Sequence, residues 1–251
     1  MNICVFDTET TSLEKPFVYN IGYVILDENF KPLVKRDFIV EQVWHNYPLF
    51  CSAYYADKRE IYISRMKGKT VEMRKFGFIL RTMFADFEKY GIENAYAYNA
   101  PFDEKVFNFN CDWFRTNNPF ESVKIFDIRG FVHNFISNTA DFQNFCERNS
   151  YFTESGHYST TAETLFRYLD NNIDFNEEHT ALADSEIESK ILQKCVERGA
   201  DLCCPYVAKR SIVRNITRHL SIEKDGIEIF NEDYEKIIIK KTPNDTTIKL
   251  K

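Results

Sequence analysis

The first ten residues constrain the fold of this chain more than any other segment. Residues 3–6 are apolar and open a predicted buried strand over residues 3–8. Side chains alternate between the two faces of a strand, so Asp7 and Glu9 share a face. Adjacent carboxylates repel each other, and burial raises the cost of keeping both charged. The pair therefore either binds a hard cation such as Mg²⁺ or Mn²⁺ or lies at a solvated strand end.

Further along the chain, strand patterns alternate with helix patterns. Additional strands are predicted at residues 19–26, 38–41, 95–99 and 123–128. The first three strands follow one another closely, with a turn at residues 27–32, and predict an antiparallel meander. The whole order predicts an α/β fold in which parallel strands join this meander in a mixed sheet flanked by helices.

Two helices stand out, because each ends at a glycine. The pattern over residues 70–90 precedes Gly91, and the pattern over residues 181–198 precedes Gly199. The apolar side of the first helix is predicted to contain Phe78, Met83, Phe84 and Phe87. Both segments are therefore expected to pack on the sheet.

Other helix signals are more local. Pro101 is suited to the first turn of a helix, and Thr160 with Glu163 has the spacing of a capping box. Residues 42–69 contain many aromatic and basic residues without a clean period. We interpret them as an inserted loop region with short helices.

Asp103 is a third candidate acid. It follows Pro101 in the first turn of the predicted helix and shares a face with the apolar Val106 and Phe107. This position predicts a carboxylate on the buried face of the helix. An alternative role is to complement the positive end of the helix dipole.

Asp184 and His179 form the last candidate pair. Asp184 is in helical register with Ile187, Ile191 and Cys195, so it faces the core and needs a partner, either a metal ion or a buried salt bridge. His179 precedes Asp184 by five positions, about 140° around an ideal helix, so the two cannot share a helix face. His179 is therefore expected in the loop or first turn before this helix. The alternative to a role in the site is that His179 is a surface or helix-capping residue.

Together these residues form three ordered motifs. They are Asp7-x-Glu9-Thr-Thr, Asn99-Ala-x-Phe-Asp103 and His179-x4-Asp184. This set resembles the three exonuclease motifs of the DEDDh 3′–5′ exonucleases, over residues 2–198. That family has an RNase H-like fold and includes polymerase proofreading subunits, RNase T and oligoribonuclease.

The resemblance implies a role for each matching residue. Asp7, Glu9, Asp103 and Asp184 would bind two divalent cations, Mg²⁺ or Mn²⁺, and His179 would be the general base. The residues implied to contact or shape the nucleotide site are Thr10, Thr11, Leu13, Asn99 and Phe102. The implied activity is hydrolysis of single-stranded nucleic acid from its 3′ end to nucleoside 5′-monophosphates, with DNA favoured.

Alternatives remain within and beyond this activity. One is an RNase T-like or oligoribonuclease-like activity on RNA. The other is a nucleic-acid-binding or proofreading subunit associated with a polymerase or another replication partner. Ser12 and Tyr98 stand where the family often has glycine and histidine, and residues 42–69 are longer than the usual connection.

The C-terminal part has a different charge balance from the rest. Residues 201–251 hold 10 Lys and Arg against 8 Asp and Glu, whereas residues 1–200 hold 22 and 30. We predict an exonuclease domain at 1–199 and, at 200–251, a basic helix followed by a β-hairpin. As a helix, residues 202–222 would align Arg210, Arg214 and Arg218 for phosphate contacts. A second candidate patch consists of Arg65, Lys67, Lys69, Arg74 and Lys75.

The cysteines and the N-terminus predict the compartment. Seven scattered cysteines indicate reduced thiols rather than a disulfide framework. The start lacks a basic segment, and Asp7 interrupts its apolar run, so neither a signal peptide nor a membrane span is expected. We expect a cytoplasmic protein without a membrane partner.

Overall fold

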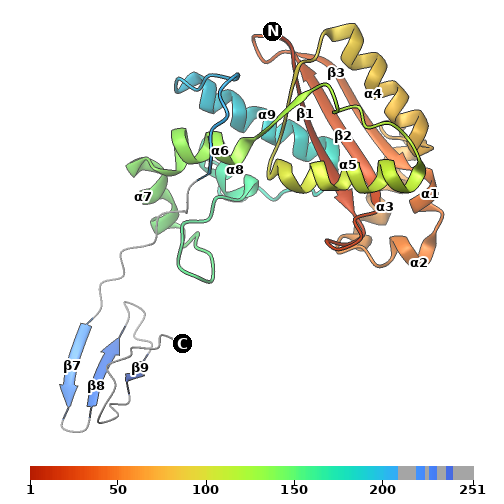
Figure 1. The fold of residues 1–251 in the computed structure, drawn as a ribbon. Coiled ribbons are helices and arrows are strands. Elements are labelled where there is room, and N and C mark those ends of the chain that lie inside the picture. Colours follow the sequence, from red (N-terminus) through yellow and green to blue (C-terminus); the bar gives the residue numbers. More distant parts are fainter. Residues whose placement is uncertain (209–218, 224–225, 231–235, 240–251) are drawn as a thin grey trace.

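The computed structural model describes residues 1–208 and three further strands at 219–223, 226–230 and 236–239 (Figure 1). Its main sheet has the strand order β4-β3-β2-β1-β5-β6. These strands are β1 (Ile3–Thr10), β2 (Val18–Leu26), β3 (Pro32–Val40), β4 (Glu72–Arg74), β5 (Asn94–Ala97) and β6 (Lys124–Asp127). β1, β2 and β3 pair antiparallel, whereas β5 and β6 continue parallel to β1, and β4 pairs parallel to β3. The predicted mixed α/β sheet is confirmed.

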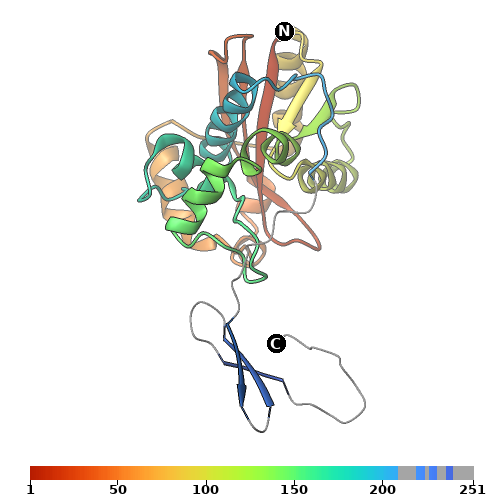
Figure 2. The same cartoon turned by 90° about the vertical axis from the view of Figure 1, so that its left-hand side faces the viewer.

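Helices cover both faces of this sheet (Figures 1 and 2). One face packs on α4 (Phe76–Tyr90) and α5 (Ala100–Phe114). The opposite face packs on α6 (Ile128–Val132), the π-helical turn η2 (His133–Ser137), α7 (Ala140–Arg148), α8 (Ala162–Asp170) and α9 (Ala181–Glu197). The sheet is therefore the middle layer of a three-layer structure.

The predicted alternation along β1 is confirmed. Cys4 and Phe6 belong to the core on the α4 and α5 side, whereas Ile3 and Val5 belong to the core on the α9 side. All four side chains are buried, as expected for a central strand with a helical layer on each face.

Residues 41–67 form a run of short helices, as predicted for the insertion. These are α1 (Glu41–Trp44), α2 (Tyr47–Phe50), the 3₁₀ turn η1 (Ala56–Lys58) and α3 (Arg59–Lys67). Buried aromatic side chains attach them to the core on the α4 and α5 side, among them Trp44, Phe50 and Tyr62. The insertion is thus packed on the domain rather than extended from it.

Two predicted elements are wrong in their bounds. Residues 72–74 extend as β4 along β3, so the helix predicted from residue 70 begins only at Phe76. The predicted apolar side is confirmed for Met83 and Phe87, which are buried, and is wrong for Phe78 and Phe84, which are 44% and 40% exposed. The strand predicted at residues 38–41 begins earlier, at Pro32. The sequence did not reveal its first half, because the charged side chains there are exposed and hide the strand pattern.

The capping box was assigned one residue too early. Thr161 is the N-cap of α8, and its hydroxyl accepts a hydrogen bond from the Thr164 N–H at 3.2 Å. Glu163 does not complete a box. Its carboxylate accepts from the Glu177 N–H at 2.9 Å, which ties α8 to the loop before α9.

The last described residues form a second, three-stranded antiparallel sheet. It contains β7 (His219–Glu223), β8 (Gly226–Phe230) and β9 (Lys236–Ile239), and β8 and β9 match the predicted hairpin. The helix predicted over residues 202–222 is wrong where it can be checked, because 202–208 are not helical and 219–223 are a strand. Arg210, Arg214 and Arg218 lie outside the described residues.

Residues 200–206 still pack on the main domain. Ala200 is buried, and the Tyr206 ring contacts Phe131 edge-on with centroids 4.9 Å apart. A Cβ on Gly130 would lie 1.9 Å from the Tyr206 carbonyl oxygen, so this close approach needs glycine. We therefore propose a domain boundary after Tyr206 rather than after residue 199. Within the described part of the chain, every helix is too short or too polar to cross a membrane.

Candidate active site

Three carboxylates meet at the end of β1. Asp7 and Glu9 project from this strand, and Asp184 projects from the first turn of α9. One oxygen from each lies within 4.8 Å of the others. The Asp184 Oδ1 atom is buried without a hydrogen-bond partner among the described residues. A buried oxygen in this position needs a cation or a proton.

Gly22 brings α9 to this position. It is the cross-strand partner of Asp7 in the β1–β2 ladder. A Cβ on Gly22 would lie 2.1 Å from the Leu182 nitrogen, so the first turn of α9 rests directly on the β2 backbone. The Ser185 hydroxyl donates to the Gly22 carbonyl at 3.1 Å and closes the contact. Asp184 consequently lies beside Asp7.

Asp103 approaches from the other side of the sheet. It occupies the first turn of α5, directly after β5, and is buried as predicted, together with Val106 and Phe107. The Thr8 hydroxyl donates to its Oδ1 at 2.6 Å. The structure does not include Asp103 in the group of three within 4.8 Å. It is a neighbour of that group, because the charge of Asp7 raises the pKa of Asp103 further after burial.

The electrostatics of these acids are unfavourable without a cation. Burial raises the pKa of Asp7 to about 7 and that of Asp184 to about 10, with neighbouring carboxylates adding to both. Burial also raises the pKa values of Glu9 and Asp103 well above their ordinary values, and the nearby charge of Asp7 is the second largest cause. No ion pair within the described residues includes any of these four acids. An all-oxygen donor set without a basic counterpart fits a hard divalent cation.

Two further acids belong to this region and were missed from the sequence. Glu188 is one turn after Asp184 on α9, is 3% exposed, and accepts a hydrogen bond from the Tyr98 N–H at 3.2 Å. Burial, followed by the charges of Asp7, Asp103 and Asp184, holds its pKa well above the ordinary value. The spacing of four from Asp184 was the signal available in the sequence.

Glu177 is the second missed acid. It is partly buried in the loop before α9, and burial raises its pKa to about 7. Its charge in turn raises the pKa values of Asp7, Glu9 and Asp184, so it adds to the negative potential at these three acids. The sequence contains no periodic signal for Glu177, because it lies outside any helix or strand.

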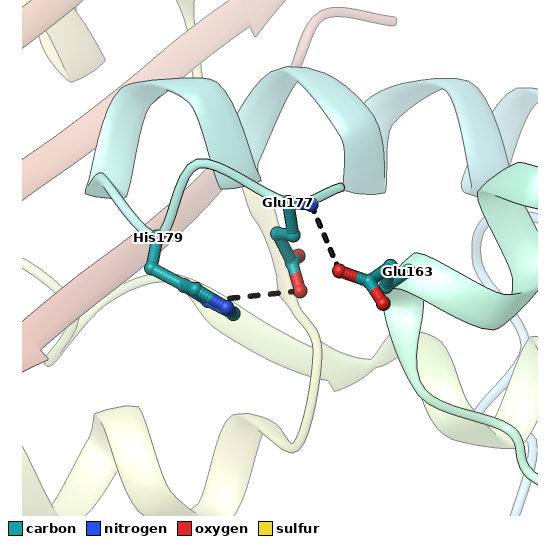
Figure 3. Close-up of side chains that lie close together, drawn as sticks. All are labelled: Glu163, Glu177 and His179. Atoms are coloured by element: carbon teal, nitrogen blue, oxygen red, sulfur yellow. Dashed lines mark hydrogen bonds and ion pairs between the residues drawn. The ribbon is translucent and has the colours of Figure 1, made fainter. Parts of the chain in front are cut away.

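His179 lies in the loop before α9, as predicted, with a positive φ of 55°. Its ring does not join the three acids. Its Nδ1 faces the Glu177 carboxylate at 3.8 Å, and these two residues form a separate group with Glu163 (Figure 3). The ring also stacks on Tyr55, with centroids 4.3 Å apart and planes 12° from parallel. Burial, and then the charge of Lys58, lower its pKa, so the imidazole is neutral at pH 7.

The predicted nucleotide-contact residues surround the same strand end. Thr10 ends β1, and Thr11 is buried in the turn that follows. Leu13 is 74% exposed, and its carbonyl accepts from Lys105 Nζ at 2.7 Å. Asn99 and Phe102 begin α5, where the Asn99 Oδ1 accepts from Arg129 at 2.8 Å. An exposed apolar side chain at Leu13 is available to a ligand.

No protein-family model matches the sequence, and a search of curated proteins finds no relative. Solved structures do match the fold. The nuclease domain of 3′hExo, a DEDDh family member bound to rAMP, has a TM-score of 0.55 at 15% identity, with 84% of this chain and 97% of that chain covered. Exonuclease I of E. coli, in complex with a dA16 oligonucleotide, has a TM-score of 0.47 at 15% identity.

The match to E. coli exonuclease I covers 78% of this chain and 40% of that chain. Exonuclease I from Methylocaldum szegediense also matches, over 80% of this chain and 41% of that chain. The second of these has a TM-score of 0.49 at 16% identity. At such identities the match is one of fold. The chain has the mixed-sheet, RNase H-like fold of the 3′hExo nuclease domain, the fold that its three motifs predict.

Proposed function

We propose that this protein is a metal-dependent 3′–5′ exonuclease that acts on single-stranded nucleic acid. The observation that carries the proposal is the convergence of Asp7, Glu9 and Asp184, from a strand and a helix far apart in sequence, with one buried oxygen unpartnered. A fold that gathers like charges without a basic residue is destabilised unless a cation binds them. The similarity in fold to an exonuclease domain supports the same conclusion.

The four acids have distinct places in this proposal. Asp7, Glu9 and Asp184 would hold a divalent cation, and Asp103 would complete the site for a second, with Mg²⁺ or Mn²⁺ as the ions. Bound ions of this kind neutralise phosphate charge and lower the pKa of a coordinated water. Thr8 holds the Asp103 carboxylate by its hydrogen bond, so that acid is oriented before any ion binds.

His179 would accept the proton of the attacking water. Its neutral imidazole at pH 7 supports this role, since a general base must begin unprotonated. Thr10, Thr11 and Leu13 would contact the terminal nucleotide from the turn after β1, with Leu13 as the exposed apolar side chain. Asn99 and Phe102 would shape the site from the start of α5.

The substrate is proposed to be the 3′ end of a single strand, with DNA favoured and nucleoside 5′-monophosphates as products. RNA is the second candidate, because 3′hExo is bound to a ribonucleotide, rAMP. A polymerase partner remains a separate proposal, which co-purification would test.

The test compares single-stranded DNA and RNA of matched sequence, each labelled at its 5′ end, in Mg²⁺ or Mn²⁺. A ladder that shortens from the 3′ end, and that disappears in EDTA and in Asp7→Ala, supports the proposal and identifies the preferred sugar. A substrate blocked at its 3′ end is the control for direction. Equal cleavage of the blocked substrate, or persistence of cleavage in Asp7→Ala, would reject it.

A further inference from the structure

Arg65 contacts both residues that flank His179. Its guanidinium donates to Glu178 Oε2 at 2.8 Å and to Thr180 Oγ1 at 3.1 Å. It also donates to Asp37 Oδ2 on β3 at 3.2 Å. These bonds link α3 of the insertion to the turn before α9, across more than 110 positions of sequence. A planar guanidinium with several donors can hold three acceptors at once.

We propose that Arg65 and Tyr55, both from the insertion at residues 41–67, are positioning residues that hold His179 in place for the proposed reaction. The inference rests on the proposed function, in which His179 accepts the proton of water. It assigns to the insertion a part in the active site.

The His179 turn requires such support. His179 has a φ of 55°, in the left-handed region that a non-glycine residue adopts only when its surroundings hold it there. Its neighbour Thr180 is completely buried. The next residue, Ala181, donates its N–H to Asn20 Oδ1 at 2.8 Å. The backbone is therefore fixed immediately after His179.

The insertion also reaches this second attachment. The Tyr62 hydroxyl, on α3, donates to the same Asn20 Oδ1 at 2.9 Å. The Asn20 amide in turn donates to Asp37 Oδ1 at 2.7 Å, and Asp37 accepts from Arg65 through its other oxygen. One connected network thus joins α3, β2, β3 and the start of α9. Loss of Arg65 removes both bonds from this network to the flanks of His179.

The ring of His179 has one neighbour on its face and another at its edge. Tyr55 stacks on the face, with ring centroids 4.3 Å apart. Figure 3 shows the second neighbour, the Glu177 carboxylate, which lies 3.8 Å from Nδ1. Glu177 is itself held, because its N–H donates to Glu163 at 2.9 Å. A carboxylate beside Nδ1 favours the tautomer protonated there, which leaves Nε2 as the proton acceptor.

These contacts replace the role predicted for Arg65. The sequence suggested that it contacts nucleic acid phosphates as part of a basic patch, but its donors bind Asp37, Glu178 and Thr180. Arg74 of the same patch pairs with Glu72 at 2.9 Å. Arg65 therefore acts within the domain rather than on its surface.

The test uses Arg65→Gln, Arg65→Lys and the stacking variants Tyr55→Leu and Tyr55→Phe. Arg36→Gln is the matched control, because Arg36 forms a comparable partly buried pair with Asp86, at 2.9 Å. The measurements are kcat and KM on a single-stranded oligonucleotide, Mn²⁺ affinity by calorimetry, and the imidazole resonances of His179 by NMR. The NMR measurement does not depend on enzymatic activity.

Arg65→Gln is expected to lower kcat roughly 10- to 100-fold with KM and Mn²⁺ affinity nearly unchanged, because it displaces a catalytic group. It should also shift the His179 resonances, and Arg65→Lys should recover part of both effects. Tyr55→Leu should follow Arg65→Gln, whereas Tyr55→Phe, which keeps the ring, should resemble the unmodified protein. Arg36→Gln should lower the melting temperature without either effect.

Unchanged kcat and unchanged His179 resonances in Arg65→Gln, with a melting temperature lowered as in Arg36→Gln, would overturn the proposal. If Arg65→Gln does not fold, the comparison of Tyr55→Leu with Tyr55→Phe decides in the same way. Shifted His179 resonances in a protein that hydrolyses neither DNA nor RNA would reject the nuclease function while supporting the positioning of His179.

Discussion

Gly22 lies directly opposite Asp7 in the β1–β2 ladder, and the first turn of α9 rests on its backbone. The space that a Cβ would fill at Gly22 is taken by the backbone of Ala181 and Leu182. One missing side chain thus allows a helix to bring Asp184 to the strand that carries Asp7 and Glu9.

Gly22→Ala is predicted to destabilise the protein by about 1–3 kcal/mol or more, because overpacking against backbone cannot be relieved by a rotamer change. It should also lower divalent-ion affinity, since α9 must move away from β1. Thermal and denaturant unfolding, with Mn²⁺ calorimetry, measure both effects.

Gly77→Ala is the matched control for this substitution. Gly77 lies in α4, and the nearest atoms to an added Cβ are side-chain atoms at 3.5 Å or more. Alanine in a helix should be neutral or stabilising by about 0.5–1 kcal/mol. Equal stability losses at the two positions would contradict the close-approach explanation.

The metal-free protein is predicted to lose stability as pH rises from about 5 to 9. Asp7, with a pKa of about 7, and Asp184, with a pKa of about 10, keep protons in the folded state that the unfolded chain releases near pH 4. The folded state therefore binds more protons in this window, and stability falls as they are lost. Melting temperatures in EDTA and in excess Mn²⁺ test this, since Mn²⁺ should remove the decline. A melting temperature that rises with pH in EDTA would contradict it.

Asp184→Asn is predicted to raise the melting temperature of the metal-free protein at pH 8 and to abolish the stabilisation by Mn²⁺. At pH 8 the folded state keeps a proton on Asp184 that the unfolded chain has released, and asparagine removes the cost of this proton uptake. A gain of 1 kcal/mol corresponds to about 2–4 °C in a domain of this size. Asp112→Asn, at an exposed position on α5, is the control and should change neither property. Full Mn²⁺ stabilisation in Asp184→Asn would remove Asp184 from the metal site.

His179→Ala is predicted to reduce kcat by roughly 10²–10⁴-fold, the usual range for loss of a general base, while Mn²⁺ affinity is retained. The ring lies outside the group formed by Asp7, Glu9 and Asp184, so metal binding should not depend on it. His45→Ala, at an exposed position after α1, provides the control. Turnover close to normal in His179→Ala would exclude the base role.

Glu188→Gln is predicted to raise the stability of the metal-free protein at pH 8, because it removes a buried carboxylate and keeps an acceptor for the Tyr98 N–H. Glu188→Leu lacks that acceptor and should cost about 1–3 kcal/mol relative to Glu188→Gln. Denaturant unfolding at pH 8 compares the two variants. A large loss of Mn²⁺ affinity in Glu188→Gln would instead identify Glu188 as a metal ligand.

Local patterns in the sequence predicted the faces of the elements well. The alternation along β1 placed Asp7 and Glu9 together, and the helical register of Asp184 with Ile187 and Ile191 placed it toward the core. Such predictions succeed because the periods of strands and helices are set by backbone geometry. They failed at Phe78 and Phe84, because the buried face of α4 is centred on Ile79, Leu80 and Met83, and these two aromatic side chains lie outside it.

The sequence by itself thus determined the antiparallel meander, the mixed sheet and the inward direction of Asp103 and Asp184, but it did not show β4 or the buried Glu188. Only the tertiary structure decided which of the acids meet. Asp184 lies beside Asp7 because α9 packs on the backbone of Gly22. Asp103 lies outside this group of three, and His179 faces Glu177 instead. The bond from Arg65 to Thr180 joins residues 115 positions apart. Backbone periodicity operates within a single element, whereas contacts between elements depend on the packing of the whole chain, which no local pattern encodes.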